Sequence, residues 1–124
     1  MKNKSTYTIS SSLNEDILEI IYIGELTNGS HDKIVSDTGS IIRENNVYKV
    51  LIDISALNGR LGITDTYQRV RNFPPRVYKM RFAVVNKNGQ DEIEQFQETT
   101  ASNAGIQVKW FTNPDAARAW LKGN

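Results

Sequence analysis

Few side chains in this sequence have the types and spacing that catalysis or metal binding requires. His31 is the only histidine, and it lies between Ser30 and Asp32. Serine, histidine and aspartate make a hydrolytic triad, but neighbouring residues on a helix point in different directions and cannot hydrogen-bond in series. A single imidazole and the lack of cysteine argue against histidine or thiolate metal centres, disulfides and thiolate catalysis. We therefore predict no catalytic residue, no metal site and no cofactor, and we expect the chain not to be an enzyme.

The carboxylates between Asp91 and Glu98 are candidates for a cation site. Glu94 and Glu98 stand one helical turn apart, and such a pair could bind a divalent cation. The inner face of the same helical pattern is occupied by Ile93 and Phe96. This pattern predicts a solvated outer helix face for the carboxylates.

A loop with two glycines, Gly59-Arg60-Leu61-Gly62, precedes a helical pattern that begins at Ile63. The amides of a helix N-terminus bind anions, and glycine-rich loops use them to hold phosphate. The loop has neither the full dinucleotide-binding fingerprint nor the Lys-Ser/Thr pair of a P-loop. Two interpretations remain open: the glycines only relax the loop, or the helix N-terminus receives an anion or a phosphoryl group.

Six basic residues lie between Arg60, within this loop, and Arg81, and Asp65 is the only acid in that range. Five of the six are arginines, which bind carboxylate and phosphate in a fork geometry. They form either a solvated helix and loop, or a basic surface for an acidic protein partner, a lipid headgroup or another small anionic ligand. The net charge of +1 and the lack of an aromatic stacking motif argue against nucleic acid. The six residues are Arg60, Arg69, Arg71, Arg76, Lys79 and Arg81.

The element that must position these residues is a buried strand. Val50-Leu51-Ile52 and Ile54 form an almost continuous apolar run, which is typical of the middle of a parallel or mixed sheet. Such sheets meet ligands and partners at the carboxyl ends of their strands. We therefore expect partner binding on the loop Ser55–Gly62 and the helix Ile63–Phe73. The predicted partner-binding residues are Asp53, Ser55, Asn58, Gly59, Arg60, Gly62, Arg69 and Arg71.

Around this strand the sequence predicts the order β-β-α-β-α-β-α-β-α. The polar strand Tyr7–Ser11 and the buried strand Ile17–Ile23 form an antiparallel hairpin with a turn at Leu13–Asp16, and the polar strand is expected at the sheet edge. Helices and strands then alternate, which predicts right-handed crossovers and mostly parallel strands. The later elements are a helix from Asn28-Gly29-Ser30 to Asn45-Asn46, the central strand from Val47, the helix Ile63–Phe73, the strand Met80–Val85, a helix from Ile93 to Ala104 closed by Gly105, the strand Ile106–Trp110 and a helix from Asn113 to Gly123.

Length and composition predict one domain over residues 1–124. The hydrophobic content of 39% and the charged content of 23% are typical of a globular protein. The N-terminal sequence MKNKSTYTISSS lacks the apolar core of a signal peptide, and no run is long enough to span a bilayer. We therefore expect a cytoplasmic protein.

This order of elements resembles the STAS domain (sulphate transporter and anti-sigma factor antagonist), and the layout of the CRAL-TRIO lipid-binding fold is similar. The resemblance covers nearly the whole chain, and its closing segment looks like the divergent bacterial branch of the family. It implies an α/β fold with a mixed sheet, and a non-enzymatic regulatory module that binds a protein, either an acidic partner or a kinase-like regulator. The resemblance is carried by the opening hairpin, Leu51-Ile52-Asp53-Ile54-Ser55, Phe82-Ala83-Val84-Val85, Asn103-Ala104-Gly105-Ile106 and the segment Phe111–Leu121.

The sequence departs from the family at the phosphorylation motif. Regulatory STAS domains carry a phosphorylatable serine after the central strand, in an Asp-Ser-(Ser/Thr)-Gly sequence. This chain has Arg60–Asp65 at the corresponding place, without an Asp-Ser pair. Thr64 is the nearest hydroxyl and Ser55 is the other phosphorylation candidate. The departure argues against a kinase-driven switch.

An alternative hypothesis is a small-molecule or lipid carrier. Its pocket would lie between the sheet and the helices, around Tyr67, Phe73 and Tyr78. The sequence is also compatible with a homodimer.

Overall fold

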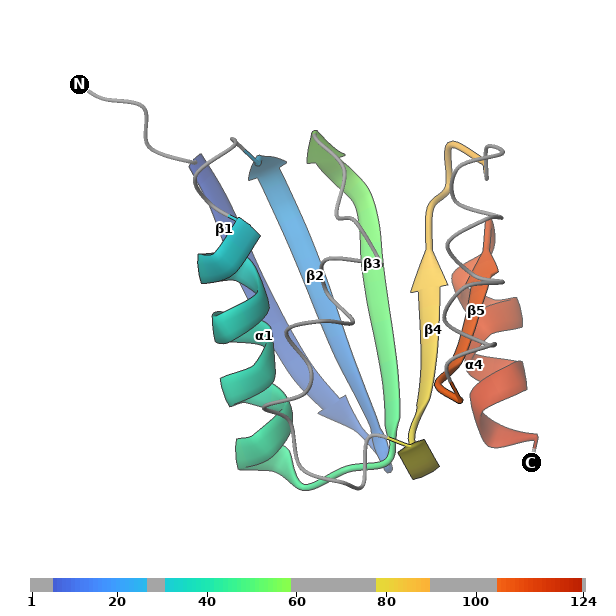
Figure 1. Ribbon diagram of the computed structural model, residues 1–124. Helices are drawn as coiled ribbons and strands as arrows, with labels where there is room; N and C mark the ends of the chain where they lie inside the picture. The colour runs from blue at the N-terminus through green and yellow to red at the C-terminus, as the bar shows by residue number, and fades with distance from the viewer. Residues whose placement is uncertain (1–5, 27–30, 59–77, 90–104, 124) are drawn as a thin grey trace.

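The computed structural model describes residues 6–26, 31–58, 78–89 and 105–123. These residues form a five-stranded sheet in the order β1-β2-β3-β4-β5 (Figure 1). The β1–β2 pair is antiparallel, and the other three pairs are parallel. This arrangement confirms the predicted α/β fold that opens with a hairpin. The elements are β1 Thr6–Asn14, β2 Ile17–Glu25, α1 His31–Asn45, β3 Lys49–Asn58, β4 Arg81–Val85, β5 Gln107–Phe111 and α4 Pro114–Lys122.

The opening hairpin has longer strands and a shorter turn than predicted. Leu13 and Asn14 pair with β2 and so belong to β1, which leaves Glu15 and Asp16 as the turn. Glu15 has a φ of 59°, the left-handed backbone that favours tight two-residue hairpins. The sequence did not predict the longer β1 because backbone pairing, and not an apolar pattern, extends this strand. β1 lies at the edge of the sheet, as predicted.

β3 lies at the centre of the sheet, as predicted, and its neighbours are β2 and β4. It continues to Asn58, because β2 runs to Glu25 and pairs with it that far. The amide of Leu26 adds a hydrogen bond to the Asn58 carbonyl at 2.8 Å. The prediction that a loop begins at Ser55 is therefore wrong, since Ser55 lies within the strand.

The pairing between β2 and β3 contains one β-bulge. Ile21 pairs with Asp53, but Ile23 pairs with Ala56. Two residues of β3 therefore stand opposite the single residue Tyr22, and the strand bends locally.

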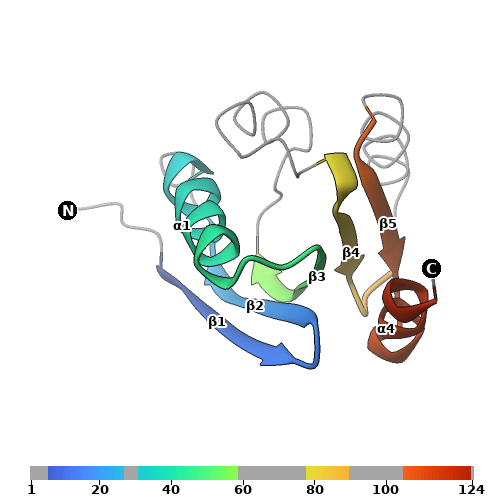
Figure 2. The same cartoon turned by 90° about the horizontal axis from the view of Figure 1, so that it is seen from below.

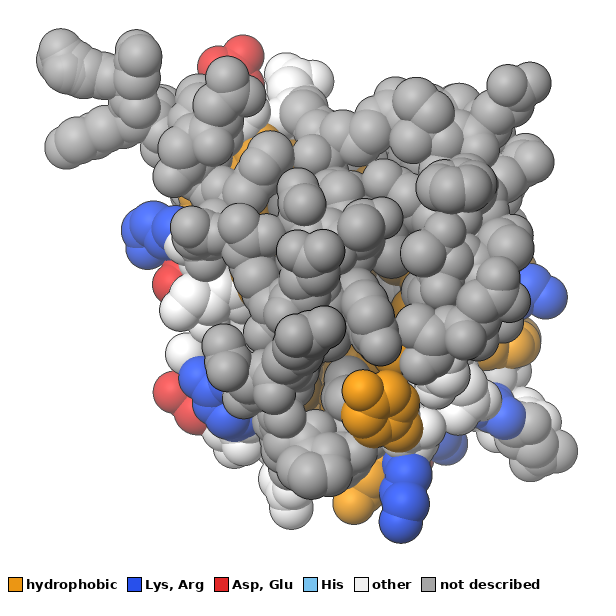
Figure 3. All heavy atoms as spheres, viewed as in Figure 1, with side chains coloured by type: hydrophobic (Ala, Val, Ile, Leu, Met, Phe, Trp, Pro, Cys, Tyr) orange, Lys and Arg blue, Asp and Glu red, His pale blue; other side chains and the backbone are white. Residues whose placement is uncertain are grey.

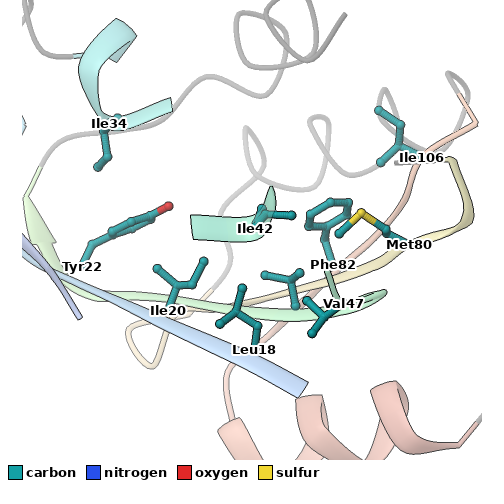
Figure 4. Packing of buried hydrophobic residues seen from close by; sticks show 10 residues of the cluster. Leu18, Ile20, Tyr22, Ile34, Ile42, Val47, Met80, Phe82 and Ile106 are labelled. Carbon is teal, nitrogen blue, oxygen red and sulfur yellow. The ribbon is translucent and has the colours of Figure 1, made fainter. Parts of the chain in front are cut away.

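Successive side chains of each strand point to opposite faces, and both faces of the sheet are covered in part (Figure 2). α1 packs on one face, called here the α1 face, and α4 packs on the other, the α4 face. The buried cluster on the α1 face is Leu18, Ile20, Tyr22, Ile34, Ile42, Val47, Val50, Met80, Phe82 and Ile106 (Figure 4). The buried cluster on the α4 face is Ile17, Leu51, Ala83, Val85, Ala117 and Leu121.

Both described helices follow the predicted patterns. α1 buries Ile34, Thr38 and Ile42, one turn apart, against the sheet. α4 begins after Asn113, whose Oδ1 accepts hydrogen bonds from the amides of Asp115 at 2.7 Å and Ala116 at 3.3 Å. Neither helix is long and apolar enough to cross a membrane. The predicted helices at 63–73 and 93–104 lie outside the described residues.

Candidate partner-binding site

Two segments meet at the carboxyl ends of β3 and β4. One is Asp53–Asn58 of β3, and the other is the turn Asn86–Gly89 that follows β4; together they are called here the carboxyl edge. The parallel register pairs Asp53 with Val85, the last residue of β4. The two segments therefore leave the paired region at the same level of the sheet.

Ser55 joins these two segments. Its hydroxyl oxygen accepts a hydrogen bond from the Lys87 amide at 2.8 Å, and its carbonyl accepts one from Nδ2 of Asn88 at 3.2 Å. Its own amide donates to Oδ1 of Asp53 at 2.9 Å. The amide, carbonyl and hydroxyl of Ser55 thus all hold the end of β3, and two of them hold it against the turn.

The turn after β4 is stabilised from within and from β5. The Asn88 amide donates to Oδ1 of Asn86 at 3.0 Å, and the Gly89 amide donates to the Asn86 carbonyl at 3.1 Å. The Asn86 amide donates to the Phe111 carbonyl at 2.9 Å. Gly89 has a φ of 104°, a conformation that glycine adopts readily. The carboxyl ends of β3, β4 and β5 are therefore linked in series.

The carboxyl edge carries polar side chains with one basic group, Lys87, and one carboxylate, Asp53. Asn58, Lys87 and Asn88 are exposed, and Asp53 is half-buried with one carboxylate oxygen bound to the Ser55 amide. Within the described ranges, no three His, Asp or Glu side chains are grouped so that they could hold a metal ion. Amide and ammonium groups on a hydrogen-bonded framework suit recognition of another molecule by hydrogen bonds and charge.

Solved structures share this architecture over almost its whole length. An anti-sigma factor antagonist from Mycobacterium paratuberculosis has a TM-score of 0.64 at 13% identity, over 94% of this chain and 95% of that one. The anti-sigma factor antagonist SpoIIAA in its unphosphorylated form has a TM-score of 0.57 at 15% identity, over 96% and 98%. An uncharacterised Shewanella loihica protein with a SpoIIAA-like fold also reaches 0.57, at 20% identity over 98% of each chain. The chain has a STAS-like fold. No protein-family model and no curated protein sequence matches it.

The STAS-like fold brings three of the predicted partner-binding residues to one place. Asp53, Ser55 and Asn58 all lie on β3 within the carboxyl edge. Their role in partner binding stays a prediction. The predicted residues Gly59, Arg60, Gly62, Arg69 and Arg71 and the phosphorylation candidate Thr64 lie outside the described residues.

Two of the six basic residues lie far from the carboxyl edge. Lys79 and Arg81 are at the amino end of β4, so their assignment to a basic surface at the carboxyl end of β3 is wrong. A connection between parallel strands must return from the carboxyl end of one to the amino end of the next, which separates neighbours in sequence. Nη1 of Arg81 donates to the Trp120 carbonyl at 3.0 Å, and its guanidinium lies 5.4 Å from the Trp120 ring centroid. Arg81 therefore holds α4 on the sheet.

Of the residues predicted to line the carrier pocket, the structure describes only Tyr78. Tyr78 lies just before β4 and is 52% exposed, at the same end of the sheet as Lys79. Figure 3 shows hydrophobic and basic side chains next to one another at this lower end of the molecule. Tyr67 and Phe73 lie outside the described residues, and the carrier hypothesis stays a prediction.

The role of the turn after β4 in the carboxyl edge was not predicted from the sequence. In the structure, the Lys87 amide and the Asn88 side chain both donate hydrogen bonds to Ser55. One signal was available: neighbouring parallel strands end at the same edge, so the residues after Val85 had to lie beside those after Asp53.

Proposed function

We propose that this chain is a non-enzymatic regulatory module that binds another protein through the carboxyl edge. The observation that carries this proposal is the junction at Ser55, which fixes two surface segments together in a fold shared with anti-sigma factor antagonists. Residues on exposed segments held by a rigid sheet are well placed to bind a partner without reorganising first.

The groups available at the carboxyl edge indicate how a partner would be recognised. Asn58 and Asn88 offer amide donors and acceptors, and Lys87 adds an exposed positive charge. An acidic segment of a partner protein would match this set. Attraction between exposed opposite charges mainly raises the association rate, and it weakens as salt rises.

The unmodified serine is the form of Ser55 that fits this proposal. Its hydroxyl oxygen already accepts the hydrogen bond from the Lys87 amide, so a phosphoryl group on that oxygen would displace the turn. We therefore assign Ser55 to positioning the carboxyl edge. Thr64 remains the other candidate for phosphorylation.

A charge reversal at each end of β4 tests where the partner docks. Lys87 and Lys79 are both exposed and lie at the carboxyl and amino ends of β4. A partner is first identified by capture on the wild-type chain and then purified. We expect Lys87→Glu to weaken its binding about tenfold, or about 1.4 kcal/mol, in biolayer interferometry. Lys79→Glu, the matched control, should bind like the wild type.

Thermal unfolding of both variants supplies the second control, because exposed charges contribute little to stability and the melting temperatures should stay unchanged. Loss of binding in Lys79→Glu alone would place docking at the amino end and overturn the proposal. Equal affinity for all three proteins would remove the carboxyl edge from the interface.

A further inference from the structure

β1 forms one edge of the sheet and has few features that would discourage pairing with a further strand. β1 pairs with β2 on one side, and no described element lies beyond it on the other (Figures 1 and 2). Natural edge strands usually carry charges, prolines or bulges that discourage further pairing. The nine residues of β1, TYTISSSLN, contain no charge, no proline and no glycine, and they pair with β2 without a bulge.

The geometry of the hairpin determines which backbone groups of β1 face outward. Asn14 and Ile17 close a two-residue turn, so they form a hydrogen-bonded pair, and such pairs alternate along an antiparallel ladder. The amides and carbonyls of the even-numbered residues therefore point to β2. Those of the odd-numbered residues point away from the sheet. The outward-facing residues are Tyr7, Ile9, Ser11 and Leu13.

We propose that β1 pairs antiparallel with β1 of a second copy of this chain, with the two-fold axis at Ser10. This register sets Tyr7 opposite Leu13 of the second copy, and Ile9 opposite its Ser11, as hydrogen-bonded pairs. It is the register in which all four outward-facing residues find partners. Centring the pairing on Ile9 or on Ser11 keeps the faces matched but leaves one of the four without a counterpart on β1.

The side chains of β1 are complementary to themselves in this register. Side chains of directly paired residues lie on the same face of a sheet. Leu13, which is 54% exposed, would lie beside the ring of Tyr7 of the other copy on the α1 face. On the α4 face, Thr8 would meet Ser12, and Ser10 would meet its own equivalent. No charged side chain meets another across the two β1 strands, because β1 contains none.

A single position on the axis gives a decisive test. In the dimer, Ser10 faces its own equivalent in a non-hydrogen-bonded pair, with Cα atoms about 4.5 Å apart. Ser10→Lys and Ser10→Glu each place two like charges opposite one another, which destabilises a cross-strand pair. We expect the wild-type chain to sediment as a dimer, and each variant to dissociate at least tenfold more readily. An equimolar mixture of the two variants should recover the dimer, because opposite charges then meet.

Thr112 supplies the matched control. It is exposed and directly follows β5, the strand at the opposite edge of the sheet from β1. Thr112→Lys and Thr112→Glu should sediment like the wild type. Unchanged thermal unfolding of diluted Ser10 variants would show that their monomers remain folded.

A covalent readout checks the same register without relying on charge. The chain contains no cysteine, so Ser10→Cys introduces the only thiol. Its separation from its equivalent lies within the range of a disulfide, and oxidation should therefore give a cross-linked dimer in high yield. Thr112→Cys should stay largely uncrosslinked.

A monomeric wild-type chain at the highest soluble concentration would overturn the proposal. A dimer that persists equally in Ser10→Lys and Ser10→Glu would also overturn it, by placing the interface elsewhere. A monomer that instead takes up a strand from another protein at β1 would identify a different occupant and contradict self-pairing. None of these outcomes depends on the carboxyl edge.

Discussion

Arg118 and Glu19 lie 99 positions apart in sequence and form the ion pair that fastens α4 to β2. The Arg118 guanidinium donates through Nε at 2.7 Å and Nη2 at 3.0 Å to the two carboxylate oxygens of Glu19. Glu19 is buried, whereas Arg118 is partly exposed and also contacts Asp115 at 3.0 Å. The hydrogen bonds from Arg118 lower the pKa of the Glu19 carboxyl against the opposing effect of burial.

This asymmetry predicts unequal costs for removing the two partners. Arg118→Met leaves a buried carboxylate without its cation and should lower the free energy of unfolding by about 3 kcal/mol. Glu19→Gln leaves an arginine that still reaches solvent and Asp115, and should cost about 1 kcal/mol. Urea unfolding at neutral pH measures both, and the double variant should be more stable than Arg118→Met alone. Equal costs for the two single variants would contradict the asymmetry.

The same pair gives a pH dependence with a definite sign. The pKa of Glu19 is lowered in the folded wild type. The contribution of its carboxylate to the free energy of unfolding is therefore complete above the ordinary pKa of 4.5, and it is lost as the pH falls below that value. In Arg118→Met, burial without the cation should raise that pKa instead. The difference in unfolding free energy between wild type and Arg118→Met should therefore shrink as the pH falls from 7 toward 4.

At the scale of elements, α1 is attached to the sheet by a buried pair of hydroxyls. The Thr38 hydroxyl donates to the Ile34 carbonyl at 2.7 Å and lies 2.5 Å from the Tyr22 hydroxyl. Thr38 has one hydroxyl proton, so Tyr22 must be the donor between them. Burial raises the pKa of Tyr22 to about 12.

Removing either hydroxyl should weaken the attachment of α1, but by different amounts. Tyr22→Phe removes one hydrogen bond and should cost about 1 kcal/mol. Thr38→Val leaves the buried phenol without its acceptor and should cost about 2–3 kcal/mol. Urea unfolding of the two variants decides the order. A smaller loss in Thr38→Val would show that Tyr22 finds another acceptor.

Tyr22 also sets how the fold responds to alkali. Its pKa in the folded state lies above the ordinary value of 10, so the neutral phenol favours the folded chain below pH 10, and this contribution is lost as the pH rises toward 12. The unfolding free energy of Tyr22→Phe should fall less steeply over that range than that of the wild type.

For the whole molecule, the sequence predicted the described strands and their order because hydrophobic alternation reports burial directly. The apolar run of β3 predicts a central strand because both of its faces must be buried. The serine and threonine of β1 predict an edge strand. The predictions failed where pairing alone extends an element. Leu13 and Asn14 at one end of the sheet, and Ser55 to Asn58 at the other, join strands because a neighbouring strand reaches them.

The candidate site could likewise be predicted only in part. Asp53, Ser55 and Asn58 follow from the rule that sheets bind at the carboxyl ends of strands. The hydrogen bonds from Lys87 and Asn88 to Ser55 depend on the exact register of β3 against β4, which no local pattern contains. Long-range ion pairs such as Glu19 with Arg118 could not be predicted for the same reason.

The bulge in β3 makes the central strand tolerant of a change in length at one position. Two residues, Ile54 and Ser55, stand opposite Tyr22, so a chain without Ser55 would pair regularly and every flanking side chain would keep its face. Deleting Ile52 from the regular part would instead bring Asp53 opposite Ile20 and turn its carboxylate toward the buried α1 face. We expect the Ser55 deletion to unfold cooperatively at a reduced temperature in circular dichroism, and the Ile52 deletion not to fold. Insertions and deletions among distant homologues should accordingly collect at this one point of an otherwise length-invariant strand.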